Sequence, residues 1–279
     1  MTAVSMHAPL TVADIEKHLA TRRFGRRLEL FEELDSTNTT ARELAVAGAD
    51  EGTTIIAESQ RRGRGRLGRS WASPAHRNLY LSLVLRPSCS PAVLPQLTLV
   101  LGLAAAEAVR EWTADVKIKW PNDLLIAGRK LAGILTESVA DDAGVQFVIP
   151  GIGVNLNSEP DDFPPDVRSL ATSLRMVTGH VVDRPGFAGR LLNHCEARYD
   201  EWQRDGFHAL APAWETYSCL TGRAIVVQSQ ERGHRERIAG TAMGLADDGT
   251  LRVRAANGAE HHIVAGDVSV VDGYDRSLT

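Results

Sequence analysis

Two stretches of the chain gather residues that can handle anions and activated carbonyl groups. The first, GRGRLGRSW from Gly63 to Trp71, alternates glycines with the guanidinium groups of Arg64, Arg66 and Arg69. Glycine lets backbone amides approach a ligand closely, and arginine presents a rigid fork that matches carboxylate and phosphate oxygens. This stretch therefore predicts a loop that closes over a small anion.

The spacing G-x-G-x-x-G from Gly63 to Gly68 also occurs in dinucleotide-binding turns, which continue into a helix and need an acid about 20 residues on. Here the chain continues as SPAHRN, a turn, and NLYLSLVLR, a strand without an acid, and no G-K-[ST] sequence is present. A solvated basic face or a nucleic-acid patch is an alternative for the arginines. Base stacking has little support, because Trp71 is the one aromatic residue in the stretch.

The second stretch is KWPNDLLIAGRKLAGILTE. A two-residue hairpin turn at 127–128 pairs Leu125 with Lys130 and Asp123 with Ala132. The period-two alternation of strands then puts Asp123 and Lys130 on one face. The pair predicts a charged site, with an exposed cross-strand ion pair as the purely structural alternative.

Three glycines fall inside predicted strands, namely Gly133 in KLAGILTES and both Gly151 and Gly153 in PGIGVNLN. A glycine inside a strand marks a bulge or a place where a ligand or another backbone approaches closely. Asn155 follows them and supplies an amide side chain. We therefore expect a ligand to lie against this part of the sheet.

The bulk composition excludes several classes of protein. A chain of 279 residues, 43% hydrophobic and 24% charged, suits one large domain with a small one, and its net charge of −4 gives no global attraction to nucleic acid. Three cysteines without C-x-x-C fit a reducing cytosol rather than a disulfide framework or zinc ribbon. The first residues do not resemble a signal peptide. The most apolar run, from Leu94, is interrupted by Gln96 and Glu107, and it predicts a buried helix instead of a membrane span.

Periodicity and turn residues predict strands at ELFEELD, GTTIIAES, NLYLSLVLRP, VKIKW, NDLLI, KLAGILTES and VQFVIPGIGVNLN. Helices are predicted after the cap residues Asp35 to Thr37, over 94–112, and in a segment that ends at Gly206. From about residue 221, short strands alternate with DDG and NG turns, which is typical of a small all-β barrel. The predicted organisation is a tail or linker at 1–28, a catalytic domain at 29–218 and a small β domain at 219–279.

Five motifs together resemble the biotin protein ligase family (biotin–acetyl-CoA-carboxylase ligase). They are STN at 36–38, Q-x-x-GRGRLGRSW from Gln60, KWPNDLL from Lys119, KLAGIL from Lys130 and GIGVNLN from Gly151. The resemblance implies an α/β (α+β) fold, in which a mixed-sheet domain similar to class II aminoacyl-tRNA synthetases precedes a small SH3-like β-barrel. Members that also repress transcription carry an N-terminal winged helix. The weak pattern of the first 30 residues fits the ligase-only type instead.

The family's activity implies that ATP converts biotin to biotinyl-5′-AMP and pyrophosphate, and that biotin then passes to a lysine of a biotin carboxyl carrier protein, a subunit of acetyl-CoA carboxylase. Mg²⁺ is implied by ATP, but no local cluster of carboxylates predicts a metal site. The resemblance implies a cytoplasmic enzyme without a membrane partner, and it leaves a homodimer open. Two alternatives remain: a lipoate or octanoate-type acyl ligase on the same fold, and a DNA-binding biotin-responsive regulator, which the acidic charge balance disfavours.

The resemblance also assigns site residues. For biotin they are Ser36, Thr37, Asn38, Gln60, Arg64, Gly65, Arg66, Lys130, Gly133 and Gly151, and for ATP they are Arg64, Arg66, Arg69, Trp71, Asn122, Lys130 and Asn155. Lys130 and Arg66 would stabilise developing charge, and Asp123 would orient or deprotonate the acceptor lysine. Helix capping is an alternative role for Ser36 and Thr37, and core packing is an alternative for Trp71.

Overall fold

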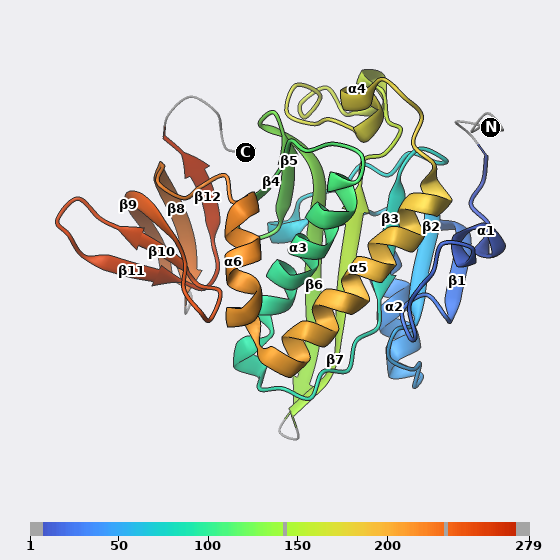
Figure 1. Ribbon diagram of the computed structural model, residues 1–279, viewed down its shortest axis with the longest axis horizontal. Helices are drawn as coiled ribbons and strands as arrows, with labels where there is room; N and C mark the ends of the chain where they lie inside the picture. Colours follow the sequence, from blue (N-terminus) through green and yellow to red (C-terminus); the bar gives the residue numbers. More distant parts are fainter. Residues whose placement is uncertain (1–7, 142–143, 232–233, 272–279) are drawn as a thin grey trace.

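The computed structural model describes residues 8–141, 144–231 and 234–271. Two β-sheets organise them, a seven-stranded sheet in the order β1-β2-β3-β7-β6-β5-β4 and a five-stranded sheet in the order β11-β10-β9-β8-β12. In the large sheet β1 and β2 are parallel and the other neighbours are antiparallel. Figure 1 shows the large sheet behind long helices, with the small sheet beside it. The expected fold class, a mixed α/β domain with a second, smaller β unit, is confirmed.

The large sheet contains β1 (Leu28–Leu34), β2 (Thr54–Gln60), β3 (Leu79–Leu83), β4 (Val116–Lys119), β5 (Asp123–Ile126), β6 (Arg129–Asp141) and β7 (Gly144–Val154). The small sheet contains β8 (Ala224–Glu231), β9 (His234–Leu245), β10 (Leu251–Arg254), β11 (Glu260–Ile263) and β12 (Asp267–Val270). The helices are α1 (Val12–Glu16), α2 (Thr37–Val46), α3 (Pro95–Arg110), α4 (Leu174–Thr178), α5 (Arg184–Asp205) and α6 (Phe207–Tyr217). Short 3₁₀ turns are η1 (Arg66–Gly68), η2 (Pro91–Val93) and η3 (Pro160–Asp162).

The strands and long helices predicted before residue 206 are confirmed. Helix α6 was not predicted, because Pro212 lies inside it and proline normally removes an intrahelical hydrogen bond. The helix forms nonetheless, with Leu210 and Trp214 buried against the rest of the core. Tertiary packing therefore overrides the local signal here.

The two faces of the large sheet are covered differently. Ile56 of β2 packs in the main core with α3 and α5, whereas its neighbour Ile55 packs in a smaller cluster with Ala41 and Ala45 of α2. Adjacent strand residues point to opposite faces. Helices α3 and α5 therefore cover one face, as Figure 1 shows, and α2 lies on the other. We call the face that carries α2 the site face.

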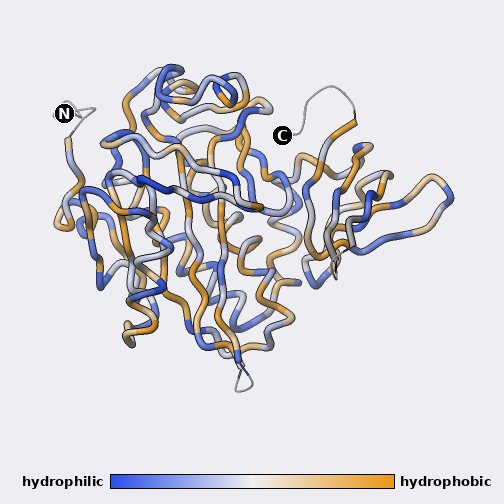
Figure 2. The backbone as a smooth tube through the Cα atoms, turned by 180° about the vertical axis from the view of Figure 1, so that it is seen from behind, coloured by the Kyte–Doolittle hydropathy of each residue, from blue (hydrophilic) through white to orange (hydrophobic). Residues whose placement is uncertain are grey.

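Helix α3 is the buried helix that the sequence predicted. The segment Pro91–Arg110 is long and apolar enough to cross a membrane, but 67% of its most apolar window is buried inside the protein. A helix that is apolar on all sides is typical of a core element. Figure 2 shows hydrophobic residues along the central strands and helices.

The described part of the segment that we expected to be a tail packs onto α5. Ile15 and Phe24 are fully buried in the main core. The three consecutive backbone amides at 22–24 donate to the carboxylate of Glu196, at 2.6 to 2.8 Å. Hydrogen bonds to a charged group are stronger than neutral ones. The N-terminal segment is therefore held to the large domain by both apolar contacts and a buried carboxylate.

A second anchor lies where this segment begins. The side chains of Arg184 and Glu58, both almost completely buried, form an ion pair at 2.5 Å. Arg184 also donates to the carbonyl of Ala8 at 2.6 Å, and the backbone amide of Leu10 donates to Glu58. The buried charges are thus satisfied by backbone groups of the N-terminal segment as well as by each other.

The small sheet follows α6 after a short connection. The turns of the predicted DDG and NG sequences place Gly249 and Gly258 at φ of 84° and 86°, where glycine is favoured. The connection runs beside the edge strand β4, and the amide of Cys219 donates to the carbonyl of Ile118 at 3.1 Å. The predicted domain division at 218 falls in this connection.

We expect Glu196→Ala to lower the free energy of unfolding by about 3 kcal/mol at pH 7, because three amide donors lose their acceptor. Burial opposes ionisation of Glu196, but those amides and Arg23 hold its pKa below the usual range. This stabilisation is complete above the ordinary glutamate pKa of about 4.3 and is lost as the pH falls through the lower pKa of the folded state.

Urea denaturation of the wild type and the variant, at pH 7 and in steps towards pH 3, measures both effects. Glu16→Ala is the matched control, because Glu16 is exposed in the same segment and its loss should change stability by less than about 0.5 kcal/mol. A difference between wild type and Glu196→Ala that stays constant down to pH 3 would contradict the assignment.

Candidate active site

The N-terminus of α2 begins a buried polar cluster on the site face. Ser36 is the N-cap residue, yet its side chain makes no capping hydrogen bond. Instead, Gln60 of β2 accepts from the backbone amide and the hydroxyl of Thr37, at 2.9 and 3.2 Å, and donates to Ser73 at 3.0 Å. A neighbouring strand therefore caps this helix. The capping alternative for the Ser36 side chain is wrong, and one N–H of Gln60 remains available to a ligand.

Asn38 follows Thr37 in α2, and its side chain is held in one orientation. Its Nδ2 donates to the carbonyl of Leu135 at 3.2 Å and to the carboxylate of Glu137 at 2.7 Å, and both partners can only accept. Its Oδ1 accepts from the hydroxyl of Ser82 at 2.6 Å. Gly151 lies against this amide so closely that a Cβ there would overlap it. Asn38 can therefore offer a ligand an acceptor and no donor.

The next row of the sheet provides a surface without side chains. Asp123, Gly133 and Gly153 are Cα partners on β5, β6 and β7. The indole of Trp71 lies over both glycines, since an added Cβ would stand 3.3 Å from the ring at Gly133 and 2.7 Å at Gly153. Among the described residues, the buried indole Nε1 has no hydrogen-bond partner. The two glycines thus accommodate Trp71, and its N–H can still serve a ligand.

Lys130 extends over Gly133 beside the indole. Its Nζ lies 2.6 Å from Oδ1 of Asp123 and 5.5 Å from the centroid of Trp71. Its backbone pairs with the segment before α4, donating to Leu170 at 2.7 Å and accepting from Thr172 at 2.9 Å. Lys130 is therefore held both by its backbone and by its ammonium group. The predicted proximity of Asp123 and Lys130 is confirmed.

The predicted register of the hairpin was only partly correct. The two turn residues at 127–128 have φ of 49° and 74°, as a two-residue turn requires, and the first pairs beside the turn form as predicted. The pairing of Asp123 with Ala132 was wrong, because Asp123 lies opposite Gly133. A bulge adds one residue to β6 in this interval, and period-two counting from the sequence cannot detect it.

The arginine loop, residues 63–71, folds as a small closed hairpin. Arg64 and Ser70 form an isolated antiparallel bridge, and the amide of Trp71 donates to Gly63 at 2.9 Å. At its tip Leu67 has a φ of 55° and its side chain is 67% exposed. The loop thus presents an apolar tip, and its three arginines contact different partners.

Two of these arginines reach the small sheet or the residue just before β12. Arg66 donates to Asn122 at 3.1 Å and to the carbonyl of Gly266 at 3.4 Å, and Arg69 forms an ion pair with Asp267 at 2.6 Å. Burial lowers the pKa of Arg66, and the nearby carboxylates of Asp267 and Asp123 only partly offset it. The guanidinium remains charged but is poorly solvated, so an anion placed beside it is favoured.

The third arginine of the loop contacts the polar cluster. Arg64 forms an ion pair with Glu137 at 2.8 Å, and Glu137 also holds Asn38. By contrast, Arg61, just before the loop, turns away and pairs with Asp35 and Glu33 on the surface. The structure therefore divides the arginines of this run into two groups. Arg61 lies on the surface, and Arg64 lies at the polar cluster.

The structure brings most of the predicted site residues to one region of the site face. Around the polar cluster lie Ser36, Thr37, Asn38, Gln60, Arg64, Gly65 and Gly151, and around the glycine row lie Arg66, Arg69, Trp71, Asn122, Asp123, Lys130 and Gly133. Asn155 is buried beneath them and donates to the carbonyl of Thr172 at 3.0 Å, which supports the segment paired with Lys130.

Sequence reasoning missed four residues of the site. Glu137 could have been found by strand alternation, because it shares a face with Gly133, whereas Ser82 lies on a strand for which no site residue was predicted. Ser73 and Asp267 had no such signal. Asp267 comes from the other sheet, so only the tertiary arrangement brings it to Arg69.

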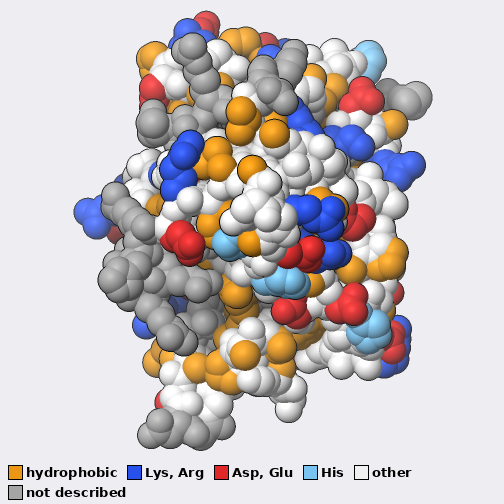
Figure 3. Space-filling view, turned by 90° about the vertical axis from the view of Figure 1, so that its left-hand side faces the viewer, with side chains coloured by type: hydrophobic (Ala, Val, Ile, Leu, Met, Phe, Trp, Pro, Cys, Tyr) orange, Lys and Arg blue, Asp and Glu red, His pale blue; other side chains and the backbone are white. Residues whose placement is uncertain are grey.

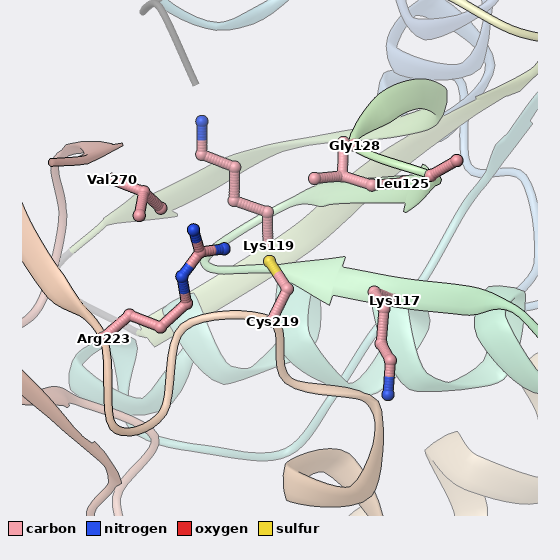
Figure 4. Close-up of a pocket in the computed structure, with 8 residues that line it drawn as sticks. Lys117, Lys119, Leu125, Gly128, Cys219, Arg223 and Val270 are labelled. Atoms are coloured by element: carbon pink, nitrogen blue, oxygen red, sulfur yellow. The ribbon is translucent and has the colours of Figure 1, made fainter. Parts of the chain in front are cut away.

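A separate cavity of about 300 Å³ lies between β4, the hairpin turn and the small sheet. It is lined by Lys117, Lys119, Leu125, Ala127, Gly128, Cys219, Arg223 and Val270. Figure 4 shows Lys119 and Arg223 extending beside Cys219. Lys119 is the Cα partner of Asp123, so the cavity borders the candidate site, but none of the predicted site residues lines it.

The surface charges give no support to a polyanion site on the face formed by the small sheet. Figure 3 shows acidic and basic side chains interspersed there. Within the described residues no group of three or more His, Cys, Asp or Glu side chains could hold a metal ion. The arginine loop and Lys130 place positive charges on the site face.

Known proteins are similar to this chain in sequence and in fold. Residues 30–155 match the Biotin/lipoate A/B protein ligase family, and residues 222–271 match the Biotin protein ligase C terminal domain. The chain is 37% identical to the bifunctional ligase/repressor BirA of Bacillus subtilis, over 89% of this chain and 76% of that protein. It is 35% identical to the biotin–[acetyl-CoA-carboxylase] ligase of Mycobacterium tuberculosis, over 81% of this chain and 82% of that protein.

A solved structure is also similar. The biotin protein ligase of Aquifex aeolicus in complex with biotin and ATP superposes with a TM-score of 0.74 at 29% identity, over 88% of this chain and 98% of that chain. The family match and the similarity of fold show that the chain is an enzyme of the biotin/lipoate protein ligase class. The chain belongs to the biotin protein ligase family.

We expect Gly153→Ala to lift the Trp71 indole off the sheet, because the new methyl group would lie 2.7 Å from the ring. Acrylamide quenching of the Trp71 fluorescence, isolated by subtracting the signal of Trp71→Phe, should increase by about twofold as the ring becomes solvated. Gly102→Ala in α3 is the control, because a Cβ there meets no atom within 4 Å. Unchanged quenching in Gly153→Ala would show that the glycine is not needed for this contact.

Proposed function

We propose that this protein is an ATP-dependent biotin protein ligase, which forms biotinyl-5′-AMP and transfers biotin to a lysine of a biotin carrier domain. The observation that carries the proposal is the continuity of two sites on one face. Among the described residues, Gln60 keeps one N–H and Asn38 keeps one oxygen lone pair without a protein partner, and both lie on the same face as the cationic groups of Arg66 and Lys130. Biotin has a ureido ring that matches the polar cluster and, at the end of a short chain, a carboxylate that matches the cationic groups.

The ring of biotin would bind in the polar cluster. Its ureido carbonyl accepts from the free N–H of Gln60, and a ureido N–H donates to the remaining lone pair of Asn38 Oδ1. Ser36 and Thr37 border this cluster. Gly65 lets the backbone approach the ligand, and Gly151 makes room for Asn38. A buried site made to hydrogen-bond a ligand strongly rejects analogues that lack the partner groups.

The first reaction joins two anions. A carboxylate oxygen of biotin attacks the α-phosphorus of ATP, a carboxyl–phosphate bond forms, the bond between the α-phosphorus and the bridging oxygen breaks, and pyrophosphate leaves. Lys130 and Arg66 stabilise the negative charge on the transferring phosphate, because both are fixed in place and incompletely hydrated. Arg64 approaches the same ligand from the polar cluster. No solvent has to reorganise around these cations during the reaction.

The nucleotide would occupy the remaining part of the site. Trp71, Asn122 and Asn155 border the adenine or the ATP phosphates, and Arg69 contacts the phosphates. Mg²⁺ would arrive with ATP, since Mg²⁺ is usually held by phosphates and only one or two carboxylates. Asp123 is the one carboxylate at the glycine row, and it is already paired with Lys130. The chain thus offers no protein cage for this ion within the described residues.

In the second reaction the acceptor lysine must lose a proton before its nitrogen attacks the carbonyl carbon of the adenylate. Asp123 is the positioned base, and AMP leaves as the amide bond forms.

The partner is the biotin carrier domain of a carboxylase, which the names of the relatives from Mycobacterium tuberculosis and Paracoccus denitrificans support. A cytoplasmic location is supported by three free cysteines. The proposal leaves a homodimer open, and it includes no binding of DNA.

The polar cluster favours biotin over the alternative acids. Lipoate and octanoate carry no urea, so they would leave the amides of Gln60 and Asn38 without ligand partners in a buried site. The purified protein should therefore form an adenylate with biotin and ATP but not with lipoate or octanoate. Mass spectrometry of the three incubations tests this, and an acyl-AMP from lipoate alone would contradict the proposal.

Lys130→Ala should reduce the rate of adenylate formation by at least about 100-fold, because it removes a fixed charge next to the transferring phosphate. The fold should persist, as checked by circular dichroism and the thermal midpoint. Lys117→Ala is the control, since Lys117 is exposed on the neighbouring strand β4. Ordinary adenylate formation by folded Lys130→Ala would refute the role of this lysine.

Arg66→Gly should release the adenylate before transfer, because the loop loses its contacts with Asn122 and Gly266 and one charge beside the phosphate. Free biotinyl-AMP, and biotin attached to a bystander protein, should increase by about tenfold or more. Arg61→Gly is the control, because Arg61 pairs only with surface carboxylates. Product selectivity equal to that of the wild type would count against closure of the loop over the adenylate.

A further inference from the structure

Glu137 occupies the point where β6, α2 and the arginine loop meet. Its Oε2 accepts from Nδ2 of Asn38 at 2.7 Å and from Nη2 of Arg64 at 2.8 Å. The Glu137 side chain is 32% exposed and that of Arg64 is 45% exposed, whereas Asn38 is buried. One carboxylate oxygen is therefore shared by a buried amide of the polar cluster and a guanidinium of the loop.

The contact with Asn38 decides which end of its amide faces the ligand. An amide that flipped would point a carbonyl oxygen at a carboxylate and at the carbonyl of Leu135, which can both only accept. Gly151 and Ser82 close the other sides. Without the carboxylate, Leu135 at 3.2 Å is the one remaining acceptor for Nδ2 in the described structure.

The contact with Arg64 has a different character. Partly exposed ion pairs contribute about 1 kcal/mol or less to stability. The pair does, however, hold the first arginine of the loop directly above the polar cluster. Loss of the Glu137 charge would leave the guanidinium without its anchor at this end of the loop, while Arg66 and Arg69 still hold the other end.

We infer that Glu137 is a positioning residue that joins recognition of the biotin ring to placement of the loop over the adenylate. Through Asn38 it sets the acceptor that meets the ureido group, and through Arg64 it holds the loop in place over the bound ligand. The inference rests on the proposed biotin site. It adds a residue that touches neither substrate but orients one group on each side of it.

The two functions of Glu137 can be separated by substitution. Glutamine keeps a neutral oxygen that accepts from Asn38, but it removes the charge that binds Arg64. Alanine removes both. A residue that only stabilised the fold would change the two properties together and in proportion to the loss of thermal stability.

The test measures KM for biotin in adenylate formation and the rate at which the adenylate escapes from the full-length protein. For Glu137→Gln we expect KM within about twofold of the wild type and escape increased by about threefold to fivefold. For Glu137→Ala we expect the same escape and KM raised by about tenfold. Glu260→Gln is the matched control, because Glu260 pairs with Arg252 at 2.7 Å on the small sheet and is 30% exposed.

A double-mutant cycle makes the link to Arg64 explicit. In an Arg64→Ala background, Glu137→Gln should add no further escape of adenylate. Independent, additive effects would overturn the inference, as would equal values of KM and escape in wild type, Glu137→Gln and Glu137→Ala. A wild-type protein that forms no biotinyl-AMP at all would instead overturn the proposed function, and the inference with it.

Discussion

The constraint on which this site depends is the partial burial of positive charge. Arg66 and Lys130 are held away from bulk water by the arginine loop, the Trp71 indole and the edge of the small sheet. A cation that is incompletely hydrated and incompletely paired favours an anion beside it. The Asp123 carboxylate and the carbonyl of Gly266 compensate these charges only in part, which leaves the site ready for a carboxylate and a phosphate.

The fold meets this constraint by placing glycines where side chains would otherwise stand. Gly133 and Gly153 lie side by side in the sheet and make room for Trp71 and Lys130, and Gly151 makes room for Asn38. The opposite face of the same strands is filled by the apolar packing of α3 and α5. The packed core on one face therefore supports the proposed ligand-binding surface on the other.

The small sheet and the residue just before β12 contribute contacts to the arginine loop. Gly266 and Asp267 hold two arginines of the loop, so they help to position side chains that we propose to act on the substrates. Glu137 performs a similar task from the large sheet through Arg64. The loop is thus attached at both ends to fixed elements, and its conformation depends on the whole chain.

The sequence by itself determined the element types and the chemistry of the site. Alternation and periodicity located the strands and long helices, and the spacing of KWPNDLLIAGRKLAGIL placed Asp123 near Lys130, because these signals are local. Only the tertiary structure decided the bulge that puts Asp123 opposite Gly133, the formation of α6 around Pro212, the packing of the N-terminal segment on Glu196, and the pairing of Arg69 with Asp267. The last three of these result from contacts between residues far apart in the chain, whose free energy outweighs the local preference.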